Sequence, residues 1–92
     1  MAHTMHIVKR KGHKEPFDDR KAYGSVYWAC ASAHVSKGDC ERIASKVVKA
    51  LDGFIDNKKE VDSSDLFTFL GNELEKHHKD AAYMFRSHRD IS

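Results

Sequence analysis

Basic side chains near the start of the chain are the first candidates for chemistry. Three of them follow one another, namely Lys9, Arg10 and Lys11. Lys21 adds a fourth positive charge ten residues farther along. A polyanion would bind these residues if the fold brought them together, because ammonium and guanidinium groups make strong, charge-assisted hydrogen bonds to phosphate.

One acidic residue within this basic stretch indicates which kind of polyanion to expect. Glu15 is a hydrogen-bond acceptor among donors. Beside a phosphate site, a carboxylate is useful chiefly for binding a sugar hydroxyl, a base amine or a metal ion. The residue types therefore point to a nucleotide.

The local pattern predicts the elements that would bring these groups together. Short extended runs lie on either side of Lys11-Gly12-His13, and Gly12 can take the positive φ of a tight turn, so a β-hairpin is predicted. Asp18 is expected to cap a helix that begins at Asp19. Lys21 would then lie on the first turn of that helix, where unpaired backbone amides add donors that point the same way.

Helical spacing of apolar residues extends through the middle of the chain. It carries the first helix to Ser32 and predicts a second helix, which follows a cap at Ser36 and ends near Gly53-Phe54-Ile55. The single tryptophan, Trp28, lies in the first helix. It could pack in the core or contact a partner, and simple packing is the favoured reading.

The last third of the chain predicts a strand and two helices. Glu60-Val61-Asp62 could add a third strand to the hairpin, and Ser63 or Ser64 then caps a third helix. The apolar face of that helix consists of Leu66, Phe67, Leu70 and Leu74. A fourth helix is predicted from about Asp80, its cap, to Arg89. We therefore expect an α+β fold, with a cap of two or three strands (the hairpin plus one short strand) packed on a four-helix cluster.

The length and composition of the chain limit the classes of function that it can have. Ninety-two residues make one domain, and 40% hydrophobic with 33% charged residues is typical of a soluble globular chain. The apolar runs are too short for a membrane span, so no membrane partner is expected. Sixteen Lys and Arg stand against fourteen Asp and Glu, a formal charge of +2, which does not favour a nucleic-acid partner.

The cysteines and the N-terminal residues give weaker indications. Cys30 and Cys40 show no zinc-ribbon spacing and follow no secretory signal, so we expect free thiols and a cytoplasmic location. Residues 1–6 are expected to be an N-terminal tail, part of it a vector remnant ahead of a second start at Met5. The folded domain is expected to span residues 7–90.

Several motifs together resemble those of a known family, the ATP-cone domain. That domain is found at the start of many ribonucleotide reductase large subunits and in the repressor of reductase genes. The matching positions are Val8-Lys9-Arg10-Lys11-Gly12, Glu15, Phe17, Lys21, Val61-Asp62-Ser63-Ser64-Asp65-Leu66 and Ala82-Tyr83-Met84-Phe85-Arg86. Lys11 departs from the pattern, because the family commonly has Asp before the glycine, and this hairpin is therefore more basic.

The resemblance implies a nucleotide site and assigns roles within it. Lys9, Arg10 and Lys21 would hold phosphates, with Lys11 adding to the positive charge. Glu15 and Phe17 would contact the base or ribose. Val8 would supply backbone contacts, and Ser63 and Arg86 would close the site. The implied ligand is ATP or dATP, with Mg²⁺ accompanying the triphosphate.

The sequence favours binding without turnover. It contains no marked nucleophile, base and orienting group, and no Gly-x-x-x-x-Gly-Lys-Ser loop, so we expect a regulatory domain rather than an enzyme. His77-His78 has poor spacing for a metal, because adjacent helical side chains point about 100° apart. As a regulator, the domain would sense adenine nucleotide and alter association with a separate protein or with itself. The alternative is a basic interaction module that binds nucleic acid or another protein and has a degenerate nucleotide pocket.

Overall fold

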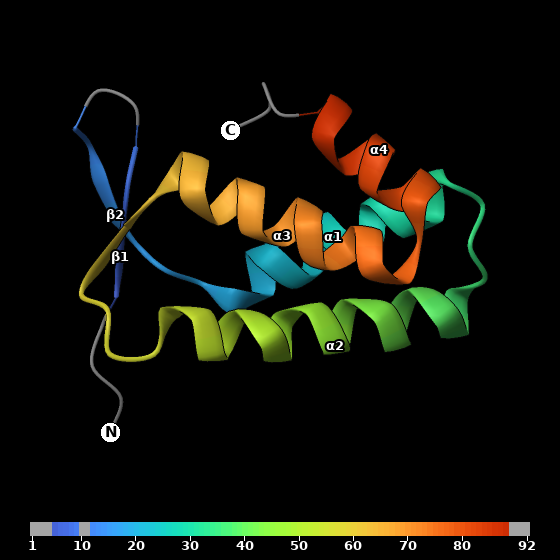
Figure 1. The fold of residues 1–92 in the computed structure, drawn as a ribbon, viewed down its shortest axis with the longest axis horizontal. Coiled ribbons are helices and arrows are strands. Elements are labelled where there is room, and N and C mark those ends of the chain that lie inside the picture. The colour runs from blue at the N-terminus through green and yellow to red at the C-terminus, as the bar shows by residue number, and fades with distance from the viewer. Residues whose placement is uncertain (1–4, 10–11, 89–92) are drawn as a thin grey trace.

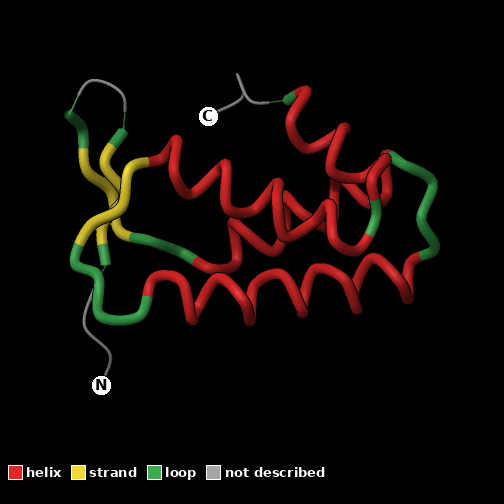
Figure 2. Tube along the Cα trace, viewed as in Figure 1, coloured by secondary structure: helices red, strands yellow, loops and turns green. Residues whose placement is uncertain are grey.

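The computed structural model describes residues 5–9 and 12–88. Within them it shows a three-stranded sheet and four helices, so the predicted α+β fold is confirmed (Figure 1). The strands are β1 (His6–Val8), β2 (Lys14–Pro16) and β3 (Glu60–Asp62). The helices are α1 (Asp19–Ser32), α2 (Lys37–Ile55), α3 (Ser63–His77) and α4 (Lys79–Ser87). The sheet lies at one end of the helices, and the connections are short (Figure 2).

The sheet is mixed, with β1 in its centre. β2 pairs antiparallel with one edge of β1 and β3 pairs parallel with the other, so Ile7 stands opposite both Glu15 and Val61. The predicted third strand is thus present. Gly12 has φ of +84°, the conformation for which a glycine was expected in the hairpin turn.

Met5 and His6, which precede the expected start of the domain at residue 7, contact the rest of the structure. Met5 is buried, and its carbonyl oxygen accepts a hydrogen bond of 2.8 Å from the backbone amide of Phe17. His6 is the first residue of β1. Both residues are thus hydrogen-bonded to the backbone of other segments, since the His6 amide also donates to the Lys59 carbonyl.

The first two helix caps are as predicted and the last two are not. Asp18 accepts from the backbone amide of Arg20 at 2.9 Å, and Ser36 caps α2. At α3, however, Ser63 is already helical and no side chain caps the start, because β3 runs directly into the helix. At α4 the cap is His78 instead of Asp80, which lies in the first turn. The predicted end of this last helix, Arg89, lies outside the described residues.

The core lies between α2 on one side and α1 and α3 on the other, with α4 packed on α1 and α3 (Figure 1). Its largest fully buried side chains are Leu51, Leu74, Val26, Val47, Cys30 and Cys40. Burying a side chain such as Leu51 stabilises the fold by about 1.5–3 kcal/mol. Both cysteines are free thiols, as predicted. Among the described residues, no helix combines the length and the apolar character needed to cross a membrane.

Candidate functional site

A cavity of about 640 Å³ lies where the sheet meets the helices. Its walls come from β1, β2, α1, α3 and the end of α4. The volume is within the range of about 300–1,000 Å³ that is usual for small-molecule sites. Five of the side chains predicted for a nucleotide site line it, namely Lys9, Glu15, Phe17, Lys21 and Ser63.

The hairpin provides the polar end of the cavity. Ile7 and Lys9 both line it, because residues two apart in an extended chain share a face. Glu15 lies diagonally across from Lys9, and the Lys9 Nζ stands 3.1 Å from the Glu15 Oε2. The cation and the lone acceptor of the basic stretch therefore form an ion pair inside the candidate site.

The start of α1 contributes Lys21 and Asp18. The Asp18 carboxylate accepts from the Arg20 backbone amide and from its guanidinium, and the hydrogen bonds of Arg20 lower the pKa of this carboxyl. The Lys21 amide donates to the Asp18 carbonyl at 3.1 Å. The amides of Arg20 and Lys21 are thus already paired, contrary to our expectation of free donors. The exposed Lys21 side chain remains directed at the cavity as one of its lining groups.

Apolar and aromatic side chains form the rest of the cavity wall. Leu66, Phe67 and Leu70 come from α3, and Phe85 comes from α4. The Phe67 and Phe85 rings are stacked, with centroids 4.7 Å apart and planes 18° from parallel. This wall offers a planar ring ligand a surface for burial and stacking.

Trp28 also lines the cavity, although its sequence position was read as simple packing. It is 41% exposed, and the His88 ring meets it edge-on at 4.2 Å between centroids. A sequence signal for this placement did exist. Lys21, Ser25 and Trp28 follow one another at i, i+4 and i+7, which puts all three on one face of α1.

Two predicted site residues lie elsewhere. Val8, between Ile7 and Lys9 in the chain, lines a second hollow that also includes Phe54 and Phe69. Arg86 of α4 contacts α3, where its Nη1 donates to Glu75 Oε1 at 2.7 Å and its Nη2 to Asn72 Oδ1 at 2.8 Å. Neither side chain lines the cavity. Arg10 and Lys11 lie outside the described residues.

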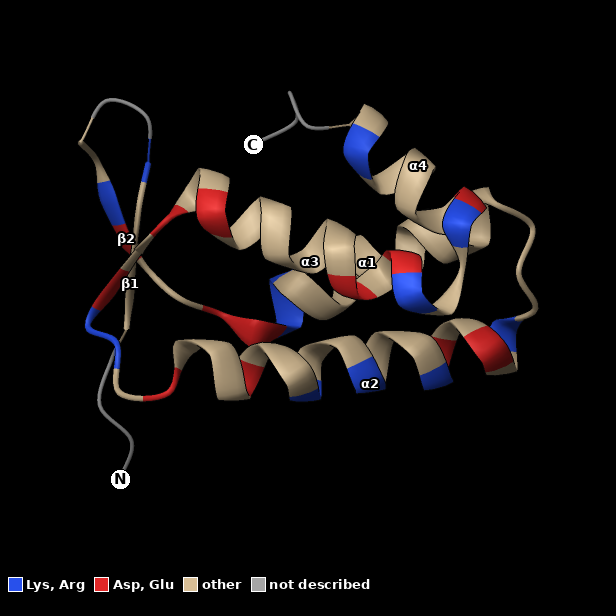
Figure 3. Cartoon of the chain, in the orientation of Figure 1, with Lys and Arg blue, Asp and Glu red and all other residues tan. Residues whose placement is uncertain are grey.

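The charged residues of the site are mixed in sign. Figure 3 shows basic and acidic residues side by side on the strands of the sheet. Within residues 5–9 and 12–88, no group of three or more His, Cys, Asp or Glu side chains is arranged to hold a metal ion. The site therefore offers two lysines, a carboxylate paired with Lys9, a carboxylate paired with Arg20, and an apolar wall.

Comparison with known proteins gives two findings. A family model described as the ATP cone domain matches residues 5–90. The chain is also 28% identical over 90 residues to the transcriptional repressor NrdR of Geobacter metallireducens. That alignment covers 94% of this chain and 59% of the repressor, so the chain spans about three fifths of the length of that relative.

Proposed function

Because the chain belongs to the ATP-cone family, we propose that its cavity binds ATP or dATP and that occupancy regulates how the domain associates with a partner or with a second copy. The family is typically an allosteric, nucleotide-sensing regulatory domain. The observation that carries the proposal is the cavity itself. It has two lysines and two carboxylates, Glu15 and Asp18, at one end and stacked phenylalanines at the other.

The polar end suits a triphosphate. Lys9 and Lys21 would each donate to phosphate oxygens, and a hydrogen bond to a charged group contributes about 1.5–3 kcal/mol. Ser63 would donate its hydroxyl from the first turn of α3, whose amide end favours anions. Arg10 and Lys11 would add charge from the hairpin. Mg²⁺ would enter with the triphosphate and neutralise part of its charge.

The rest of the cavity suits the nucleoside. Phe17 and the wall formed by Phe67 and Phe85 would bury the base. Glu15 would accept from a ribose hydroxyl or a base amine. Val8 would contribute through its backbone alone, because its side chain lines the second hollow. The Arg86 side chain is left out of this pocket, because Glu75 and Asn72 hold it.

Regulation would follow from a difference in affinity. A ligand shifts an equilibrium between two association states only if it binds them unequally. The relative from Geobacter metallireducens is, by its name, a transcriptional repressor. By analogy, this domain would convert the identity of the bound nucleotide into a change of assembly, without hydrolysing it.

A calorimetric titration with ATP, dATP and GTP in the presence of Mg²⁺ tests the proposal. We expect saturable binding that prefers adenine, with amide NMR shifts concentrated at residues 7–9, 15–28 and 63–70. Light scattering on the same samples would report the change of assembly. Absence of binding to all three nucleotides, together with salt-sensitive binding to DNA, would instead support the basic interaction module.

A further inference from the structure

One of the two lysines that line the cavity already has a partner. Lys9 and Glu15 both line the cavity, and their charged atoms are 3.1 Å apart. Their side chains are 36% and 37% exposed, so ligand and solvent can reach the pair. A phosphate that binds Lys9 must therefore compete with a carboxylate that is part of the same site.

The other described charges of the cavity do not offer this competition. Asp18 is engaged by the guanidinium of Arg20, at 3.2 Å from Nε and 3.3 Å from Nη2. Lys21 has no salt-bridge partner within 4.0 Å among the described residues. Among the described residues that line the cavity, Glu15 is thus the carboxylate that forms an ion pair with a lysine of the same cavity.

We propose that the Lys9–Glu15 ion pair acts as a lock on the site. A phosphate that binds Lys9 breaks this ion pair, and Glu15 is then released to accept a hydrogen bond from the nucleoside. This inference rests on the proposed nucleotide site. The lock has two consequences. Phosphate alone binds more weakly than it would if Lys9 had no carboxylate partner. A nucleoside alone binds weakly because its hydrogen-bond acceptor, Glu15, is already paired with Lys9.

The two halves of a nucleotide should therefore help each other. A phosphate group frees the carboxylate, and the freed carboxylate then improves binding of the ribose or base. Because a half-exposed ion pair is weak, the lock is one that a triphosphate can open readily. The coupling is a property of the pair, so removal of the Glu15 charge should abolish it.

The Glu15→Gln variant tests the lock, with inorganic tripolyphosphate and adenosine as separate probes. Tripolyphosphate should bind this variant about three- to tenfold more tightly than the wild type, because a competing charge is lost. In the wild type, saturating tripolyphosphate should strengthen adenosine binding, measured by NMR titration. In the variant this strengthening should disappear.

Glu60→Gln is the matched control. Glu60 lies on β3 and forms an ion pair with Lys14, with Nζ and Oε2 2.5 Å apart, and it lines the second hollow instead of the cavity. This substitution removes the same charge from a neighbouring pair without freeing Lys9. Tripolyphosphate affinity should therefore stay within about twofold of the wild-type value.

Three results would overturn the lock. They are unchanged or weaker tripolyphosphate binding by Glu15→Gln, an equal gain in Glu60→Gln, and adenosine binding that is indifferent to tripolyphosphate in the wild type. If the variant does not fold, the ¹³C chemical shift of the wild-type Glu15 carboxylate tests the lock instead. This shift should change on addition of tripolyphosphate, and an unchanged shift would overturn the lock. Failure of the wild type to bind ATP at all would refute the proposed function itself, which is a separate outcome.

Discussion

The guanidinium of Arg86 lies against the backbone of Gly71. A Cβ atom added at Gly71 would stand 3.0 Å from the Arg86 Nε and 3.4 Å from its Cγ. The arginine has little freedom to withdraw, because Glu75 and Asn72 hold its two terminal nitrogens. This contact joins α4 to α3 and explains why a small residue is buried in the middle of α3.

Substitution Gly71→Ala should therefore fail to stabilise the protein. Alanine is normally better than glycine inside a helix by about 1 kcal/mol. Here the added methyl group must displace Arg86 and disturb its hydrogen bonds, so we expect no gain in urea denaturation. Gly24→Ala is the control, because a Cβ at Gly24 meets nothing within 4 Å. A gain for Gly71→Ala equal to that of Gly24→Ala would contradict the prediction.

Loss of either cavity lysine should weaken triphosphate binding. We expect Lys9→Ala and Lys21→Ala each to reduce ATP affinity by about tenfold or more, because each removes a charge-assisted contact worth about 1.5–3 kcal/mol. The effect should be larger for Lys21, since Lys9 gives up Glu15 when it binds phosphate. Calorimetry on folded variants measures both.

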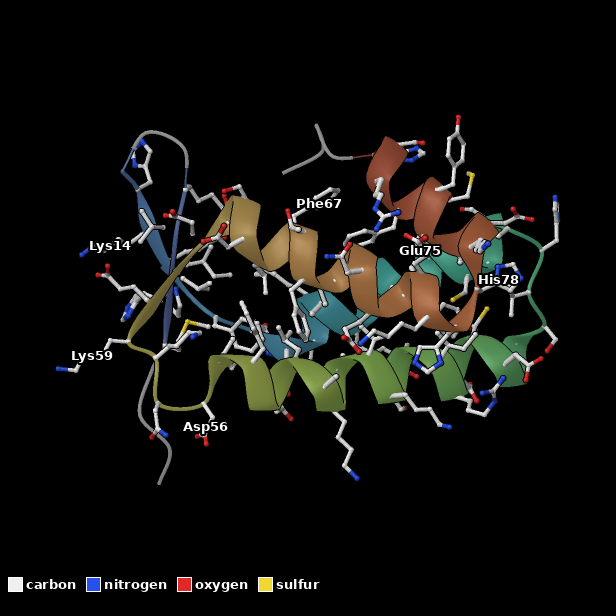
Figure 4. All side chains as sticks on the ribbon, viewed as in Figure 1. Lys14, Asp56, Lys59, Phe67, Glu75 and His78 are labelled. Carbon is white, nitrogen blue, oxygen red and sulfur yellow. The ribbon has the colours of Figure 1, made fainter. Side chains whose placement is uncertain are left out.

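Lys14→Ala provides the comparison for these variants. Lys14 carries the same charge on β2, but it pairs with Glu60 and its side chain extends away from the helices (Figure 4). Its removal should change ATP affinity by no more than about twofold. If all three variants lost affinity equally, general attraction to a basic surface would account for binding, and the assigned pocket would be wrong.

The features that could be predicted from the sequence are those fixed by neighbouring residues. Asp18 and Ser36 cap helices through contacts two and three residues away, so local pattern was sufficient. The same holds for the hairpin, which brings Lys9 and Glu15 to the cavity, and for the start of α1, which brings Lys21 there.

The features that were missed depend on contacts between distant segments. Leu66 and Leu70 have the spacing of a core face, and periodicity cannot distinguish a core from the wall of a cavity. Arg86 was placed in the site from its motif, but Glu75 and Asn72 of the neighbouring helix hold it elsewhere. The choice of hydrogen-bond partners for Arg86 depends on how α3 and α4 pack against each other, and no local sequence pattern predicts that packing.

The cap of α4 gives a test of the α3–α4 junction. His78 accepts a hydrogen bond from the Ala81 backbone amide through its Nδ1, at 3.1 Å. His78→Ala should lower the free energy of unfolding by about 1 kcal/mol, because the first turn of α4 loses its cap. His78→Asp should keep the wild-type stability, since aspartate is a preferred cap and its charge suits a helix N-terminus. Equal losses for both variants would show that the ring is needed for packing and not for capping.

The buried thiol of Cys30 should make stability fall in alkaline solution. Burial, with a contribution from neighbouring Cys40, raises the pKa of Cys30 from 9.0 to about 11. Between these values the unfolded chain releases this proton and the folded chain keeps it, so unfolding is favoured as pH rises. Each unit of pKa difference corresponds to about 1.4 kcal/mol, which sets the upper size of the effect. Urea denaturation from pH 8 to pH 11 should show a steeper fall for the wild type than for Cys30→Ala. Parallel pH profiles would mean that the thiol ionises as easily in the folded protein as in the unfolded chain.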